Sequence, residues 1–137
     1  EPLNLLSQDR YQDLKEKEEF LLTVSRKGFG KRSSCYEYRL SNRATQGISC
    51  MEITEKTGDL VNCQPIESTY ELVLITDKGQ LIRSSLSDVR ISGRKTQGVR
   101  LFRVADAENV VSCAVLKDLI EDEQEEEVSS QQEIVEN

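Results

Sequence analysis

Basic side chains recur in this chain at a constant distance of 51 residues. The repeated pairs are Lys27 and Lys78, Arg32 and Arg83, Arg39 and Arg90, and Arg43 and Arg94. Cationic groups at regular steps can follow a bent phosphate backbone, because each neutralised phosphate releases counterions into solution. The chemistry that these residues offer is therefore the binding of a phosphate-bearing partner.

The basic pairs belong to a longer internal repeat. Residues 20–66 realign on residues 71–116, and the offset falls from 51 to 50 at the turn of Thr57 and Gly58. A period of this length indicates a repeat architecture. Small residues repeat as well: Gly28 with Gly79, Ser33-Ser34 with Ser84-Ser85, and Thr45-Gln46-Gly47 with Thr96-Gln97-Gly98.

The net charge of −7 hides an uneven distribution of charged residues. Residues 20–116 carry fourteen basic and ten acidic side chains, a balance of +4, whereas residues 1–19 carry −3 and residues 117–137 carry −8. The repeat region is thus cationic and the C-terminal end is a polyanion. No run of residues approaches the ~20 apolar residues that a membrane span needs, so we expect no membrane partner.

Residue types suited to catalysis and metal binding are scarce. The chain has no histidine, and its four cysteines include no Cys-x-x-Cys pair. We therefore expect no metal site, no catalytic residue and no cofactor in this chain. Cys63 and Cys113 stand at matching positions between apolar neighbours, which predicts small, buried and reduced core residues.

The pattern of each repeat unit predicts short strands separated by polar turns. Gly28 and Gly79 stand in the first tight turn of each unit, where a hairpin needs a positive φ. About four strands in fifty residues predict an all-β fold of propeller-like blades. The expected strands are 20–25, 29–34, 48–53 and 60–66 in the first unit, and 72–76, 80–85, 99–104 and 110–116 in the second. A further short extended piece is expected in each unit, at 36–40 and at 89–91.

The two ends of the chain differ from the repeat region. Ser7 can cap a short helix that runs to Lys17, and the acidic end is expected to be disordered. Two blades cannot close a ring, and the chain begins at Glu1 rather than Met, so we expect further blades in a longer chain, or self-association of copies. The predicted organisation is an N-terminal segment 1–18, a first blade 19–67, a second blade 68–117 and an acidic tail 118–137.

Three motifs occur together in the repeat. They are Lys-Gly in the first turn, Arg-Ser-Ser at the end of the second strand, and the loop Gly93-Arg94-Lys95-Thr96-Gln97-Gly98-Val99. This combination, repeated at about fifty residues, resembles the C-terminal domain of the bacterial DNA gyrase A protein over residues 19–117. Residues 1–18 are similar to the end of an insertion between blades, and the acidic tail is similar to gyrase tails.

The resemblance implies a β-pinwheel, a propeller variant of six blades in which neighbouring blades exchange strands. It implies a non-catalytic module that wraps double-stranded DNA on a basic outer rim, without sequence specificity, so that the holoenzyme introduces negative supercoils. The implied partners are the remainder of gyrase A and the gyrase B protein, in the bacterial cytoplasm at the nucleoid. The family's Gln-Arg-Arg-Gly-Gly-Lys-Gly type box, which belongs to an early blade, is absent here.

The resemblance also places the cleavage chemistry of this type II topoisomerase outside the chain. The catalytic tyrosine, the ATP site and its magnesium lie elsewhere in the holoenzyme. We therefore expect no catalytic role for Tyr11, Tyr36, Tyr38 or Tyr70, and no enzyme in this chain alone.

The candidate DNA-binding residues are basic side chains of the repeat region. They are Lys27, Lys31, Arg32, Arg39 and Arg43 in the first unit, and Lys78, Arg83, Arg90, Arg94, Lys95 and Arg100 in the second. Other repeated residues are candidates for the architecture of turns and loops, and the glycines among them could also admit phosphate. They are Gly28, Gly47, Gly79, Gly98, Thr45, Gln46, Thr96 and Gln97.

Each assignment has an alternative. A basic side chain can be a solvated surface charge, which is our interpretation of Lys56 and Arg103. Arg43 and Arg94 can instead form an ion pair or clamp a carbonyl group inside their loops. The acidic tail can compete with DNA for the cationic surface, or it can be a solvated extension.

Two other functions compete with gyrase-type wrapping. The chain can be a propeller-type protein-interaction module, or the equivalent domain of the gyrase A counterpart in topoisomerase IV; a stand-alone enzyme ranks third. Phosphate binding weakens log-linearly with salt, which distinguishes DNA wrapping from the recognition of a protein partner.

Overall fold

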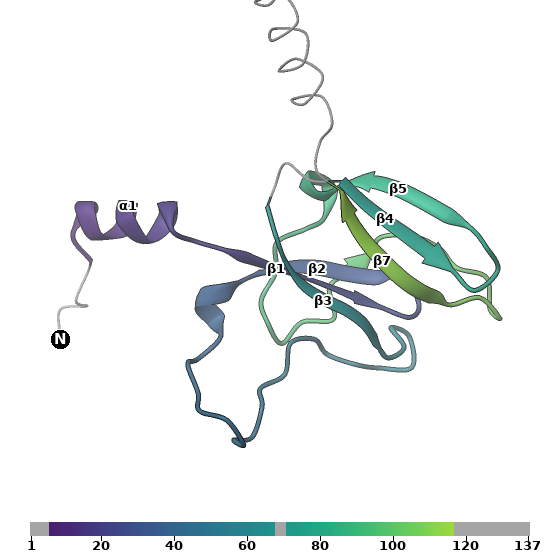
Figure 1. The fold of residues 1–137 in the computed structure, drawn as a ribbon, viewed down its shortest axis with the longest axis horizontal. Helices are drawn as coiled ribbons and strands as arrows, with labels where there is room; N and C mark the ends of the chain where they lie inside the picture. Colours follow the sequence, from purple (N-terminus) through teal and green to yellow (C-terminus); the bar gives the residue numbers. More distant parts are fainter. Residues whose placement is uncertain (1–5, 68–70, 117–137) are drawn as a thin grey trace, which may run out of the picture.

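The computed structural model describes residues 6–67 and 71–116, which form one helix and two antiparallel sheets (Figure 1). The first sheet has the strand order β3-β1-β2-β6 and the second has the order β5-β4-β7. No helix among these residues is long and apolar enough to cross a membrane. The predicted all-β class is confirmed.

The strands of the two sheets follow the internal repeat. The first unit provides β1 (Phe20–Ser25), β2 (Phe29–Ser34) and β3 (Leu60–Ile66), and the second provides β4 (Glu71–Thr76), β5 (Leu81–Ser85), β6 (Val99–Arg100) and β7 (Val110–Leu116). Each unit starts with a hairpin, β1–β2 or β4–β5, whose turn contains a glycine with φ near +80°. These two hairpins confirm the expected turns at Gly28 and Gly79.

The repeat extends to register and capping. Phe20 pairs with Ser34 as Glu71 pairs with Ser85, and the same irregularity interrupts both β1–β3 and β4–β7 near the turn. A short 3₁₀ helix follows each hairpin, at Cys35–Glu37 and at Leu86–Asp88. In both, the hydroxyl of the preceding serine accepts a bond from a backbone amide, as helix caps do.

The hydrophobic core lies between the two sheets. Alternate apolar residues of β1 and β4 face each other across it, as the two-residue period of a strand requires. Leu22 and Val24 come from the first sheet and Leu72 and Leu74 from the second, all at most 2% exposed. Each sheet therefore covers the apolar face of its neighbour.

One segment crosses from the second unit to the first. Residues 89–104, which we name the crossing segment, run along the outer edge of β2 (Figure 1). The amide of Arg32 donates to the carbonyl of Arg90 at 3.0 Å, and the amide of Leu101 donates to that of Gly28 at 2.8 Å. Strand exchange between neighbouring units is thus present.

Several predicted strands are wrong. The range 36–40 begins inside the 3₁₀ helix Cys35–Glu37 and contains no strand. The range 48–53 contains no strand either, and 89–91 forms only the bridge between Arg32 and Ile91. The range 99–104 is reduced to β6 and pairs in the sheet of the other unit, so the second sheet has three described strands rather than four. Among described residues, segment 48–53 pairs with no strand, although the Glu52 amide donates to the carbonyl of Thr96 at 3.1 Å.

The N-terminal helix, α1 (Gln8–Glu16), confirms the expected short helix capped by Ser7. The Ser7 hydroxyl accepts a bond from the Arg10 amide at 3.2 Å. The helix buries no residue and projects from the sheets (Figure 1), although the Tyr36 hydroxyl donates to the carbonyl of Leu14 at 2.6 Å. The expected disorder of the acidic tail lies outside the described residues.

Candidate nucleic-acid interface

Lys31 lies inside the protein and not on its cationic surface. Its side chain is 0% exposed, and its ammonium group donates to the carbonyl oxygens of Gly93, Arg94 and Thr96 at 2.7, 2.5 and 2.9 Å. Desolvation lowers the pKa of this amine from its ordinary value and outweighs Cys50 and the Glu37 carboxylate, which raise it. This burial corrects the prediction that Lys31 binds DNA: it tethers the crossing segment.

Arg32 also holds the second unit. Its Nε donates to the carbonyl of Val89 at 2.7 Å and its Nη2 to that of Ser87 at 3.3 Å. Arg83, the repeat counterpart, forms an ion pair with Glu71 on the β4–β5 hairpin, with Nε 2.5 Å from Oε2. Both members of this repeated pair are therefore engaged with protein groups.

The loop arginines divide between clamps and exposed groups. Arg94 donates to the carbonyl of Ser49 at 2.6 Å, and Arg39 donates to that of Gln46 at 3.1 Å. Their counterparts, Arg43 and Arg90, are exposed and make no side-chain hydrogen bond or ion pair with another described residue. The clamp interpretation thus fits Arg94, and the surface interpretation fits Arg43.

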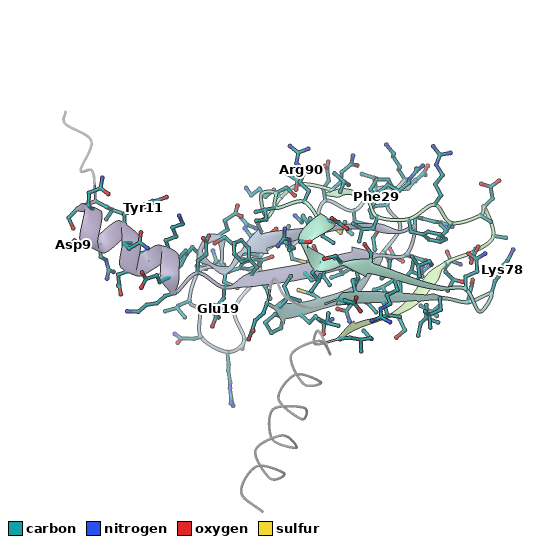
Figure 2. All side chains as sticks on the ribbon, turned by 90° about the horizontal axis from the view of Figure 1, so that it is seen from above. Asp9, Tyr11, Glu19, Phe29, Lys78 and Arg90 are labelled. Atoms are coloured by element: carbon teal, nitrogen blue, oxygen red, sulfur yellow. The ribbon has the colours of Figure 1, made fainter. Side chains whose placement is uncertain are left out.

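The exposed cations project from different parts of the second unit. Lys78 extends from the tip of the β4–β5 hairpin, and Arg90 projects outward from the crossing segment (Figure 2). Lys95, in the loop of the same segment, is exposed as well. These side chains are accessible to a large polyanion.

The repeated threonines close their loops. The Thr45 hydroxyl donates to the carbonyl of Asn42 at 2.9 Å, and the Thr96 hydroxyl donates to that of Gly93 at 2.7 Å. Both bonds span three residues, which is the geometry of a side chain that stabilises a turn. These contacts favour the architectural interpretation for Thr45 and Thr96. The side chains of Gln46 and Gln97 form no hydrogen bond with a described residue, so the role of these glutamines stays a prediction.

Two repeated glycines allow the units to approach each other. At Gly98, with φ +75°, a Cβ atom would lie 2.5 Å from the carbonyl oxygen of Gly30. At Gly28, with φ +83°, it would lie 2.4 Å from the carbonyl oxygen of Phe102. At Gly47 and Gly79 a Cβ atom would meet no described atom within 4 Å. Gly28 and Gly98 therefore serve the contact between units.

A cationic pocket of about 360 Å³ lies where the two units meet. Lys27 and Lys56 line it from the first unit, and Arg100 and Arg103 line it from the second. Sequence reasoning missed Lys56 and Arg103 because neither has a basic counterpart in the other unit. A search for repeated basic residues cannot find them, because the pocket combines residues that stand at different repeat positions in the two units.

Burial also shifts the pKa of groups other than the cationic side chains. Burial raises the pKa of Tyr38 to about 12 and that of Cys113 to about 11. Cys63 is exposed, which corrects the expectation that it is a buried core residue. Within the described ranges, no group of three acidic, cysteine or histidine side chains could hold a metal ion.

The chain matches known proteins in sequence and in fold. It matches the family described as DNA gyrase C-terminal domain, beta-propeller, over residues 19–67 and 70–117. It is 47% identical over 114 residues to the DNA gyrase A protein of Rickettsia bellii, and 43% identical over 112 residues to that of Haemophilus influenzae. These alignments cover 83% and 82% of the chain, but only 13% of either relative.

Two solved structures share the fold. A DNA gyrase A C-terminal domain superposes with a TM-score of 0.68 at 22% identity, covering 74% of this chain and 34% of that one. The C-terminal domain of a DNA topoisomerase IV superposes with a TM-score of 0.68 at 18% identity, covering 75% and 32%. At these identities the superpositions establish the fold alone.

Proposed function

This chain belongs to the DNA gyrase C-terminal domain family, and we propose that it is a non-catalytic part of gyrase A that binds and wraps duplex DNA. In this proposal the rest of gyrase A and the gyrase B protein supply strand cleavage and ATP hydrolysis in the bacterial cytoplasm. The chain itself contributes a cationic surface that contacts the phosphate backbone without reading base sequence.

The charge of the crossing segment carries the proposal. Residues 89–104 contain five basic residues, which are Arg90, Arg94, Lys95, Arg100 and Arg103, and no acidic residue. The segment covers the edge of β2, and four of its cations are exposed there, whereas Arg94 is bound to the carbonyl of Ser49. A row of cations along an outer strand can follow a bent duplex, and contacts to phosphates suffice for binding without sequence specificity.

Bending the duplex requires many such contacts. Bending a site of two to three helical turns costs on the order of 1–6 kcal/mol, which one exposed ion pair does not offset. A single crossing segment therefore binds DNA weakly, and wrapping needs several units acting together.

Salt dependence tests this function. We expect the logarithm of the affinity for a mixed-sequence 20-bp duplex to fall linearly with the logarithm of salt concentration. The double variant Arg90→Gln with Lys95→Gln should reduce the slope by about two, because each lost phosphate contact removes about 0.9. The matched control, Lys15→Gln with Lys17→Gln on α1, removes the same charge and should leave the slope unchanged.

The same titration addresses the protein-interaction alternative. A chain that shows no duplex binding at 50 mM salt, with and without residues 118–137, would contradict the proposal. Equal effects of the two double variants would also contradict it, because net charge rather than the crossing segment would then govern binding.

A further inference from the structure

The cationic pocket contains four basic groups and two acidic groups, so it has an excess of positive charge. Its charged lining consists of Lys27, Lys56, Arg100 and Arg103 together with Glu55 and Asp106, a balance of +2. None of the four bases forms an ion pair with another described residue, although two carboxylates line the same pocket. Four cations around one concave space attract an anion, because a cleft focuses their field.

Contacts inside the protein hold three of these cations in place. The Nζ of Lys56 and the Cζ of Arg100 lie 5.5 and 5.2 Å from the centre of the Phe29 ring, within the range of cation–π contacts. Phe29 is only 3% exposed, so the ring is a fixed support. The Nζ of Lys27 donates to the carbonyl of Asp106 at 3.3 Å. Such contacts reduce the side-chain entropy that ligand binding would otherwise remove.

The backbone brings the two halves of the pocket together. Gly28, beside Lys27, lies so close to Phe102 that a Cβ atom would be 2.4 Å from the Phe102 oxygen. The amides of Leu101 and Phe102 both donate to the carbonyl of Gly28, at 2.8 and 3.4 Å. The contact between units therefore creates the pocket, and neither unit contains it alone.

We propose that this pocket is a binding site for a phosphate group of the DNA backbone, at the point where the duplex passes from one unit to the next. The proposal rests on the proposed function and extends it to residues outside the repeat. Arg100 and Arg103 belong to the crossing segment, so the pocket continues the row of cations that starts at Arg90. In the repeat, Ala107 stands where Lys56 stands, so the second unit lacks this set of cations.

The test compares two variants of the full chain. Lys56→Gln with Arg103→Gln removes two cations from the pocket, and Lys15→Gln with Lys17→Gln removes two from α1. We expect the pocket variant to bind the 20-bp duplex about tenfold more weakly than the α1 variant at 100 mM salt, with a salt slope lower by about two. Amide spectra should show the backbone of both variants folded as in the unmodified chain.

A second arm distinguishes backbone phosphate from free phosphate. Titration of the unmodified chain with the duplex should shift the amide resonances of Ala105 and Asp106 at lower concentrations than titration with inorganic pyrophosphate. Pocket shifts with pyrophosphate but none with duplex would overturn the assignment to DNA.

The failure of this inference differs from the failure of the proposed function. If the unmodified chain binds the duplex and the pocket variant binds it with equal affinity and slope, the pocket does not hold a phosphate while the proposed function stands. If the unmodified chain does not bind the duplex, both fail. If the pocket variant loses its fold, single substitutions of Lys56 and Arg103 should each lower the slope by about one, and unchanged slopes would overturn the inference.

Discussion

Replacement of Lys31 by methionine tests whether this lysine is an internal tether. Methionine fills much of the same space but leaves the carbonyl groups of Gly93, Arg94 and Thr96 without their common donor. The Gly93 carbonyl keeps the Thr96 hydroxyl as a donor and the Thr96 carbonyl keeps the Glu52 amide, so among described residues only the Arg94 carbonyl loses its donor. An unsatisfied buried acceptor costs about 1–3 kcal/mol. Lys95 and Thr96 are exposed, so the loop can turn some of its carbonyls toward water. We expect the free energy of unfolding to fall by about 1–3 kcal/mol, well above the effect of an ordinary surface substitution.

Urea unfolding followed by circular dichroism measures this loss. The matched control is Lys78→Met, which removes an exposed lysine at the tip of a hairpin and should change the unfolding free energy by at most about 0.5 kcal/mol. Lys31→Ala adds a second arm, because n-propylammonium replaces the missing atoms and should raise the urea midpoint by binding the native state. Tetramethylammonium, which cannot donate a hydrogen bond, should have no such effect.

Two results would refute the tether. Lys31→Met could unfold at the same urea concentration as the unmodified chain, which would mean that the three carbonyl contacts contribute no net stability. Alternatively, the variant could keep its stability and lose affinity for duplex DNA, which would indicate that Lys31 contacts DNA.

Three further predictions follow from the structure. Gly98→Ala should destabilise the fold by at least about 1–2 kcal/mol, because Gly98 has φ +75° and the new Cβ would meet Gly30, whereas Gly47→Ala should have little effect in the same urea titration. Burial raises the pKa of Cys113 from 9.0 to about 11, so between pH 9 and pH 11 the unfolded chain binds fewer protons than the folded chain. The free energy of unfolding should therefore fall as the pH rises from 9 to 11. Cys113→Ala should make the free energy of unfolding less dependent on pH in this range. Removal of residues 118–137 should raise duplex affinity at 50 mM salt, and an identical binding isotherm would exclude competition by the acidic tail.

Local sequence patterns predicted the hairpins and the helix well. The runs of β1 and β4 are rich in β-branched and leucine residues, and each leads into a turn with glycine. These signals act within a few residues and do not depend on the rest of the fold. The Ser7 cap is equally local, because its partner is the amide of Arg10.

Strand exchange could not be predicted from the pattern of each segment alone. Segments 48–53 and 99–104 have similar alternation, but among described residues only the second contains a strand, which pairs with the edge of β2. That edge belongs to the other repeat unit, far away along the chain. A two-residue period indicates that a segment can form a strand, but it does not indicate which strand it pairs with.

The repeat also misled the assignment of some basic residues. Arg32 is repeated in register as Arg83, and yet it holds the crossing segment through the carbonyl of Val89. Lys31, which has no basic counterpart, holds the same segment. Conversely, Lys56 and Arg103 lack a basic counterpart and yet line the cationic pocket. The candidate site could thus be predicted in its charge and its general location, but the role of each cation required the contact between the units.

Amide chemical-shift mapping of the chain during titration with a 20-bp duplex at 50 mM salt tests the central claim most directly. We predict that the largest shifts lie in residues 89–104 and around the pocket at Lys56 and Ala105, with little change in α1 and β7. Shifts concentrated in α1 or β7, with the crossing segment unchanged, would contradict the claim that the crossing segment binds the DNA backbone.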